Sequence, residues 1–156
     1  MKLATYHKMI GDNVTFHKGE LKEFILEQVV EQCIKKFNKI DETVNWRGKY
    51  FSIYGYIKKR HVSLIEDIGI IGSKYEVLLL NALKYFKEYY WKKGYKIDPQ
   101  WDRVYITTLF TFHWEITIRT IEFAKQLVKS NNNIWIGGVM ASVIPNEIRE
   151  ATGIKN

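Results

Sequence analysis

The sequence predicts an α/β domain with a short parallel sheet, together with a mostly helical stretch at residues 20–98. Residues 104–109 form a compact apolar and β-branched run without strict alternation, which suits a strand buried on both faces of a parallel sheet. Residues 134–136 form a second such run. Because helical spacing separates the two runs, they predict adjacent parallel strands joined by a right-handed crossover.

The amino-terminal residues predict a helix followed by a third, shorter strand. Apolar side chains recur at helical spacing over residues 1–10, and Gly11 ends the pattern. Val14, Thr15 and Phe16 favour strand structure, so we expect a strand that ends near His17 and belongs to the same sheet.

Further helices are predicted by amphipathic spacing. Residues 20–37 and 75–92 each place apolar side chains on one face. The aromatic-rich residues 45–61 form either one helix interrupted at Gly48 and Gly55 or two short elements, and we favour the helix. The crossover helix covers residues 112–128, and a last short helix covers residues 145–151.

Composition limits the class of protein. A chain of 156 residues with 46% hydrophobic and 26% charged residues predicts one globular domain. Cys33 is the single cysteine, which excludes an intramolecular disulfide and a cysteine cage, and favours a reducing compartment. No apolar run approaches the roughly 20 residues that cross a bilayer, so we expect a cytoplasmic protein without a membrane partner.

Catalytic motifs are absent from the sequence. There is no Gly-x-Ser-x-Gly elbow, no Walker loop, no Gly-x-Gly-x-x-Gly and no pair of carboxylates in an apolar setting. Glu115 and Glu122 are most simply solvent-facing helix residues, and Cys33 is more typical of packing or surface than of a nucleophile. No catalytic residue and no metal ligand is therefore assigned.

A candidate ligand site lies where the two predicted strands end. Ligands of open α/β sheets bind beyond the carboxyl ends of the strands, near helix amino termini. The candidate residues at these ends are Thr107, Thr108, Thr111, Gly137, Gly138 and Ser142. A glycine pair lets a ligand approach the backbone, and hydroxyl groups can donate to a phosphate or an amide. Alternatively, the glycines only make a tight turn and the threonines only fill a strand end.

Three segments in this order resemble one family. The segments are MKLATYHKMIGDNV at 1–14, WDRVYITTLFTFHW at 101–114 and IWIGGVMASVIPNEIREATGI at 134–154. Together they are similar to the amino-terminal cobalamin-binding-like region of radical SAM proteins. The resemblance implies a Rossmann-like (flavodoxin-like) three-layer domain over residues 1–156, with a helical insertion at about 20–98.

The resemblance also implies a function without independent catalysis. Such an accessory domain binds a cofactor, here cobalamin, or docks on the catalytic radical SAM region or on another copy of itself. The [4Fe-4S] cluster and S-adenosylmethionine belong only to a catalytic region, whose three-cysteine motif this chain lacks. Family members also place a strand before the helix that here opens at Met1, so the chain resembles a truncated or late-starting member. The missing strand predicts an exposed apolar sheet edge and a tendency to associate.

The alternative function is a nucleic-acid-binding module. The net charge of +7 favours anionic partners. In residues 84–96, KYFKEYYWKKGYK, lysines alternate with aromatic side chains, the mixture used for phosphate attraction and base stacking. Helical spacing also places Phe86, Tyr89 and Tyr90 on the core-facing stripe, which would leave the lysines as ordinary solvated residues.

Two histidines are candidate ligands by residue type. His7 lies on the first predicted helix with unsuitable spacing to Gly11, so we reject it as a cobalt ligand. His113 follows the threonine-containing strand and could face the ligand edge, although a solvent-facing or aromatic-stacked histidine is the commoner case.

Overall fold

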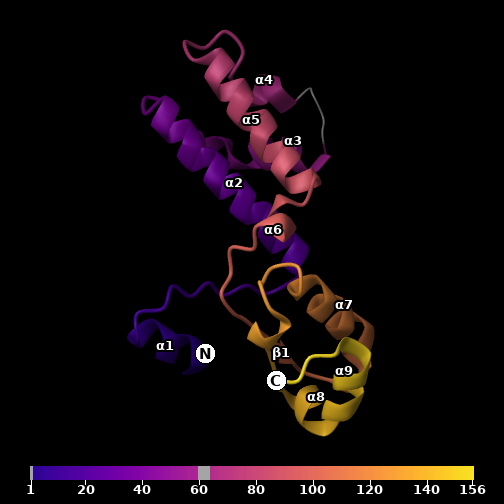
Figure 1. Cartoon of the computed structure of the whole chain (residues 1–156). Helices are drawn as coiled ribbons and strands as arrows, with labels where there is room; N and C mark the ends of the chain where they lie inside the picture. The colour runs from indigo at the N-terminus through magenta and orange to yellow at the C-terminus, as the bar shows by residue number, and fades with distance from the viewer. Residues whose placement is uncertain (1, 60–63) are drawn as a thin grey trace.

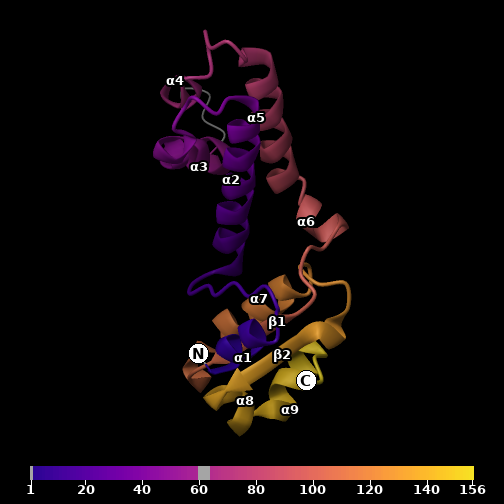
Figure 2. The ribbon, with the colours of Figure 1, turned by 90° about the vertical axis from the view of Figure 1, so that its left-hand side faces the viewer.

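The computed structural model describes residues 2–59 and 64–156, and these form a helical lobe and an α/β lobe (Figure 1). The helical lobe contains α2 (Leu21–Ile40), η1 (Trp46–Lys49), α3 (Tyr50–Lys59), α4 (Leu64–Ile68), α5 (Glu76–Trp91) and α6 (Gly94–Ile97). Figure 2 shows the long helix α2 rising from the α/β lobe into the helical lobe.

The helices predicted within residues 20–98 are confirmed for the described residues. The predicted helix at 75–92 is α5, and the one at 20–37 is the first part of the longer α2. For the aromatic stretch from residue 45, the structure has two consecutive elements, η1 and α3, rather than the single helix we favoured, and Gly55 lies inside α3 without interrupting it. Residues 60 and 61 lie outside the described part. These helices enclose a core that includes fully buried Phe37, Trp46 and Ile53.

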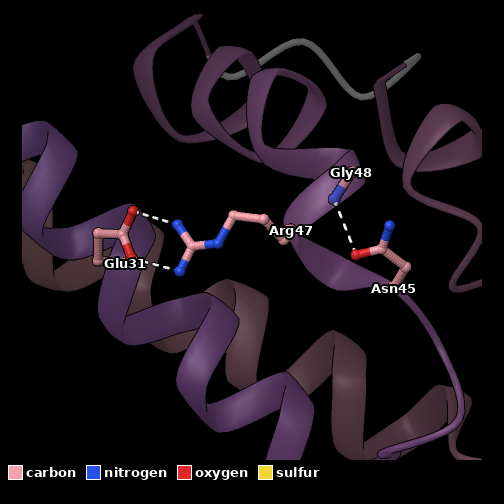
Figure 3. A network of polar contacts seen from close by, with 4 residues as sticks. All are labelled: Glu31, Asn45, Arg47 and Gly48. Atoms are coloured by element: carbon pink, nitrogen blue, oxygen red, sulfur yellow. Dashed lines mark hydrogen bonds and ion pairs between the residues drawn. The ribbon is translucent and has the colours of Figure 1, made fainter.

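A surface ion pair joins α2 to η1 (Figure 3). Both terminal nitrogens of Arg47 donate to the carboxylate of Glu31, with Nη2 2.8 Å from Oε2. The Arg47 guanidinium lowers the pKa of Glu31, chiefly through this hydrogen bonding. Next to it, the Asn45 Oδ1 accepts the backbone N–H of Gly48 and caps η1. The pair is solvent-exposed, so it orients η1 more than it stabilises the fold.

The α/β lobe contains the predicted parallel pair of strands. Its elements are α1 (Lys2–Met9), β1 (Val104–Thr108), η2 (Thr111–His113), α7 (Trp114–Ala124), η3 (Asn131–Asn133), β2 (Ile134–Gly138), α8 (Val139–Val143) and α9 (Pro145–Thr152). β1 and β2 pair in parallel, from Val104 opposite Ile134 to Thr108 opposite Gly138. The predictions of adjacent parallel strands and of an intervening helix are therefore confirmed, and the described chain is a mostly helical α/β structure.

Burial of the sheet on both faces, however, was a wrong prediction. Ile134 is fully buried against the helices, but Tyr105 and Trp135 on the opposite face remain 41% and 46% exposed. Their rings stack on each other with centroids 6.3 Å apart. Helix α1 contacts this face through His7, whose ring lies 5.2 Å from that of Tyr105. One face of this two-stranded sheet is therefore packed against the core, and the other is only partly covered.

The predicted third strand is also wrong. Val14, Thr15 and Phe16 have no regular secondary structure, and the sheet in the described residues contains only β1 and β2. Phe16 is 80% exposed. Three β-favouring residues do not make a strand without a hydrogen-bonded neighbour and a packed face, because strand preference depends on those contacts.

At the outer side of β2, the Ile136 N–H donates to the Asn156 carbonyl oxygen at 3.3 Å.

Within residues 2–59 and 64–156, no helix combines the length and the apolar character that crossing a membrane requires.

Candidate functional site

The structure brings the candidate residues of the two strands together. In the register of the sheet, Thr107 lies opposite Gly137 and Thr108 lies opposite Gly138. Thr111 begins η2, with two residues between it and the end of β1, and Ser142 lies in α8, which follows β2 directly. The sequence-based expectation that these residues share one end of the sheet is confirmed, whereas their binding of a ligand stays a prediction.

Thr108 connects the two strands to α8. Its side chain is buried, and its Oγ1 donates to the Gly137 carbonyl oxygen at 2.8 Å. The same Oγ1 accepts the N–H of Ala141 at 3.1 Å, and so satisfies an amide in the first turn of α8. With both its proton and a lone pair engaged inside the protein, Thr108 acts as a structural residue.

Gly138 is required by a close contact between backbones. Its φ is +96°, and a Cβ atom there would lie 2.0 Å from the Thr108 carbonyl oxygen. Ser142 Oγ donates to the Gly138 carbonyl oxygen at 2.9 Å. The space on the Cβ side of Gly138 is therefore filled by β1, which explains the need for glycine here without a ligand, although Gly138 and Ser142 are both exposed.

Thr107, Thr111 and Gly137 remain exposed. A Cβ at Gly137 would meet no atom within 4 Å, so solvent lies directly above it. Two small cavities, of about 80 and 50 Å³, lie elsewhere. The larger is lined by residues of β2, α8, α9 and the carboxyl-terminal segment, and the smaller by α2 together with Tyr89, Tyr95 and Trp101. None of the six candidate residues lines either cavity.

Exposed apolar side chains instead occur in the segments that follow the carboxyl ends of both strands. The apolar rim consists of Leu109, Phe110, Phe112, Ile116, Val139 and Val143, which are between 50% and 76% exposed. The rings of Phe110 and Phe112 stack in parallel at 5.1 Å. The crossover helix was predicted over residues 112–128, but α7 covers Trp114–Ala124, so Phe112 lies in η2 before the helix and Ile116 lies exposed in its first turn.

The histidines have aromatic and carboxylate neighbours. His113 is half-buried, and its ring packs edge-on against that of Phe112, with centroids 4.4 Å apart. This aromatic contact is the alternative to a ligand-facing histidine that the sequence analysis named. His7 is the buried residue of α1, and its Nδ1 lies 2.6 Å from Asp12 Oδ2. This pair ties the end of α1 to the turn that follows.

The remaining polar candidates show no catalytic arrangement. Cys33 is fully buried, and burial raises the pKa of its thiol to about 12, so the thiolate is scarce at neutral pH. Glu115 and Glu122 are exposed, and Glu122 pairs with Lys125 at 2.6 Å. Among the described residues, histidines, cysteine and carboxylates form no group of three that could hold a metal ion.

Comparisons with protein-family models, with curated proteins and with solved structures found no match. The resemblance to the amino-terminal region of radical SAM proteins therefore stays a prediction.

The apolar rim was missed at the sequence level. Its members look like ordinary core residues in the sequence, and α8 was not predicted at all because Val139–Val143 is too short to show helical periodicity. The stacking of Phe110 on Phe112 depends on η2, which turns the chain between β1 and α7. The sequence signal that could have indicated the rim is the run of apolar residues directly after a predicted strand.

Proposed function

We propose that this chain is an accessory interaction domain that docks on a larger protein through the apolar rim. The partner suggested by the resemblance is the catalytic region of a radical SAM protein. The domain itself performs no catalysis in this proposal, and its contribution is to hold or orient the partner.

The exposed apolar rim is the observation that carries this proposal. Monomeric soluble proteins rarely expose large apolar patches, and such patches commonly mark interaction sites. Phe112 is 76% and Val143 64% exposed, although they belong to separate elements, η2 and α8, at one end of the sheet. Aromatic side chains of this kind are enriched at the centres of protein interfaces.

Docking is favoured over cofactor binding by the polar groups of the same region. Cobalamin is a large ligand, and its site requires a cavity and free polar groups. The hydroxyl groups of Thr108 and Ser142 donate to backbone carbonyl oxygens, and a side chain at Gly138 would meet the backbone of β1, although Gly138 itself is exposed. The residues present thus offer exposed hydroxyl groups at Thr107 and Thr111 but no enclosure for such a group.

A photo-crosslinking experiment tests the docking surface. We expect p-benzoylphenylalanine, placed separately at Phe112 and at Val143 of the full chain in its own cells, to give the same discrete covalent adduct. Mass spectrometry identifies the captured protein, and the proposal expects one that carries a radical SAM three-cysteine motif.

The matched control is Phe51, which is 84% exposed on α3 in the helical lobe. Adducts of equal yield and identity from position 51, or no adduct from positions 112 and 143, would contradict docking through the rim. An adduct with a second copy of this chain would replace the proposed partner by self-association.

A cobalamin titration tests the rival function at the same end of the sheet. We expect hydroxocobalamin to cause no saturable absorbance change with the wild-type chain. The variant for comparison is Gly137→Val, because a side chain there enters open space and leaves the fold intact. Saturable binding that is lost in Gly137→Val would show a cofactor site and overturn the docking proposal.

A further inference from the structure

The larger of the two cavities is a feature that the proposed function does not use. It measures about 80 Å³ and is lined by side chains of β2, α8 and α9 together with residues 154–156. No member of the apolar rim lines it, so the cavity is distinct from the docking surface.

The buried part of the lining is apolar. Ile148 and Ile154 are each 3% exposed, and Ile136 and Ala141 are half-buried. The volume gives room for about five water-sized groups, which is the size of a short branched alkyl group. Because an apolar cavity offers water few hydrogen-bonding partners, an alkyl group fits this part of the lining better than water does.

The exposed part of the lining carries two positive charges. Arg149 in α9 and Lys155 after it both line the cavity, and both are solvent-exposed. Within residues 2–59 and 64–156, neither cation forms an ion pair with a carboxylate, and no aspartate or glutamate lines the cavity. The guanidinium and ammonium groups are therefore available to an external anion.

Hydrogen bonds hold the segment that carries Lys155 beside α9. On one side of it, Thr152 Oγ1 accepts the Ile154 N–H at 3.3 Å. On the other side, the Asn156 carbonyl oxygen accepts the Ile136 N–H at 3.3 Å, and Asn156 Nδ2 donates to the Asn132 carbonyl oxygen at 2.7 Å. The backbone around Lys155 is thus anchored on both sides, which lowers the entropy cost of binding an anion there.

We propose that this cavity binds a small aliphatic carboxylate. The alkyl group would occupy the buried apolar part, and the carboxylate would lie at the exposed part. There, an arginine such as Arg149 can donate two parallel hydrogen bonds to one carboxylate, and Lys155 adds a point charge. A purely polar anion such as phosphate would leave the apolar part unfilled. A free short-chain acid and the terminal residue of an apolar peptide both offer this chemistry.

Titration of the full chain, followed by ¹H–¹⁵N correlation NMR, tests the site. We expect 2-methylpropanoate to cause saturable shifts of the backbone amides of Ile136, Ala141 and Lys155. Acetate should bind about tenfold more weakly, because most of the alkyl contact is lost. The uncharged 2-methylpropanamide should also bind about tenfold more weakly, because it pairs with neither cation. Binding of N-acetylvaline more tightly than 2-methylpropanoate would assign the carboxylate to a peptide end.

Substitution of the two cations measures the contribution of charge. We expect Arg149→Gln and Lys155→Gln each to weaken the binding of 2-methylpropanoate about threefold, and the double variant about tenfold. The matched control is Arg119→Gln, because Arg119 is an exposed arginine of α7 that does not line the cavity. Its affinity should equal that of the wild type.

Filling the cavity measures the contribution of the apolar part. Ala141→Leu would place an isobutyl group where the ligand's alkyl group binds, so we expect it to abolish the shifts. Ala151→Leu is the matched control, because Ala151 is exposed on α9 and does not line the cavity. Thermal melts verify that both variants fold. Should Ala141→Leu unfold, the charge variants still decide the result.

Three results would overturn the proposal. They are no saturable shift with 2-methylpropanoate at tens of millimolar, equal affinity for 2-methylpropanamide, and a double charge variant that binds like the wild type. Tighter binding of inorganic phosphate than of 2-methylpropanoate would likewise overturn it and indicate a general anion-binding patch. Since the cavity and the apolar rim share no residue, a failed cross-link at the rim leaves this result unaffected, and the converse also holds.

Discussion

Replacement of Gly138 by alanine is expected to lower the free energy of unfolding by about 4 kcal/mol, from backbone strain and overpacking together. The added Cβ would lie 2.0 Å from the Thr108 carbonyl oxygen, and a backbone atom held in a parallel ladder cannot rotate away. The φ of +96° adds strain for any residue with a side chain. Urea denaturation followed by far-UV circular dichroism measures the loss.

Gly137→Ala is the matched control, because its Cβ would meet nothing within 4 Å. We expect its stability to stay within about 0.5 kcal/mol of the wild-type value. If the two variants were equally stable, the close approach of β1 to Gly138 would be contradicted.

Trp46→Ala should be the most destabilising change in the helical lobe. Trp46 is 1% exposed, its ring lies 4.9 Å from that of Phe37, and its Nε1 donates to the Asp41 carbonyl oxygen at 2.9 Å. Truncating a buried tryptophan costs about 3–5 kcal/mol through lost contacts and the remaining cavity. For a chain of this size, the melting temperature should fall by about 10 °C.

Phe51→Ala removes a comparable ring from a position that is 84% exposed. We therefore expect its thermal melt to coincide with that of the wild type, while Trp46→Phe should melt between the two because most of the packed area is kept. A melting temperature of Trp46→Ala equal to that of Phe51→Ala would show that η1 does not close the helical core.

Periodicity was sufficient for most of the regular structure. The stripe of apolar residues in 75–92 predicts α5 to within a residue at each end, because a helix is stabilised by local hydrogen bonds and by one face packed on the core. The two strands and their parallel pairing followed from the helix between them, since a crossover returns the chain in the same direction. By contrast, residues 14–16 had the composition of a strand but found no partner.

The sequence predicted where the candidate residues meet, but not which of them are used inside the fold. Thr108 and Gly138 were singled out because strand ends gather ligand-binding residues, and the register does bring them together. The hydrogen bonds of Thr108 Oγ1 to Gly137 and Ala141 depend on how α8 follows β2, which no local pattern encodes. The sequence therefore could not distinguish a hydroxyl group that is used inside the fold from one that is open to a ligand, such as that of Thr107.

The sequence by itself determined the order and type of the main elements, the parallel strand pair, the absence of familiar catalytic motifs and the positive net charge. These properties depend on composition and on local periodicity. The tertiary structure alone decided that Tyr105 and Trp135 face outward, that the apolar side chains after the strand ends stay exposed, and that Trp91 of α5 donates to the Ile57 carbonyl oxygen of α3. Burial and proximity between distant segments arise from packing, which sums contacts over the whole chain and is not written in any single stretch of it.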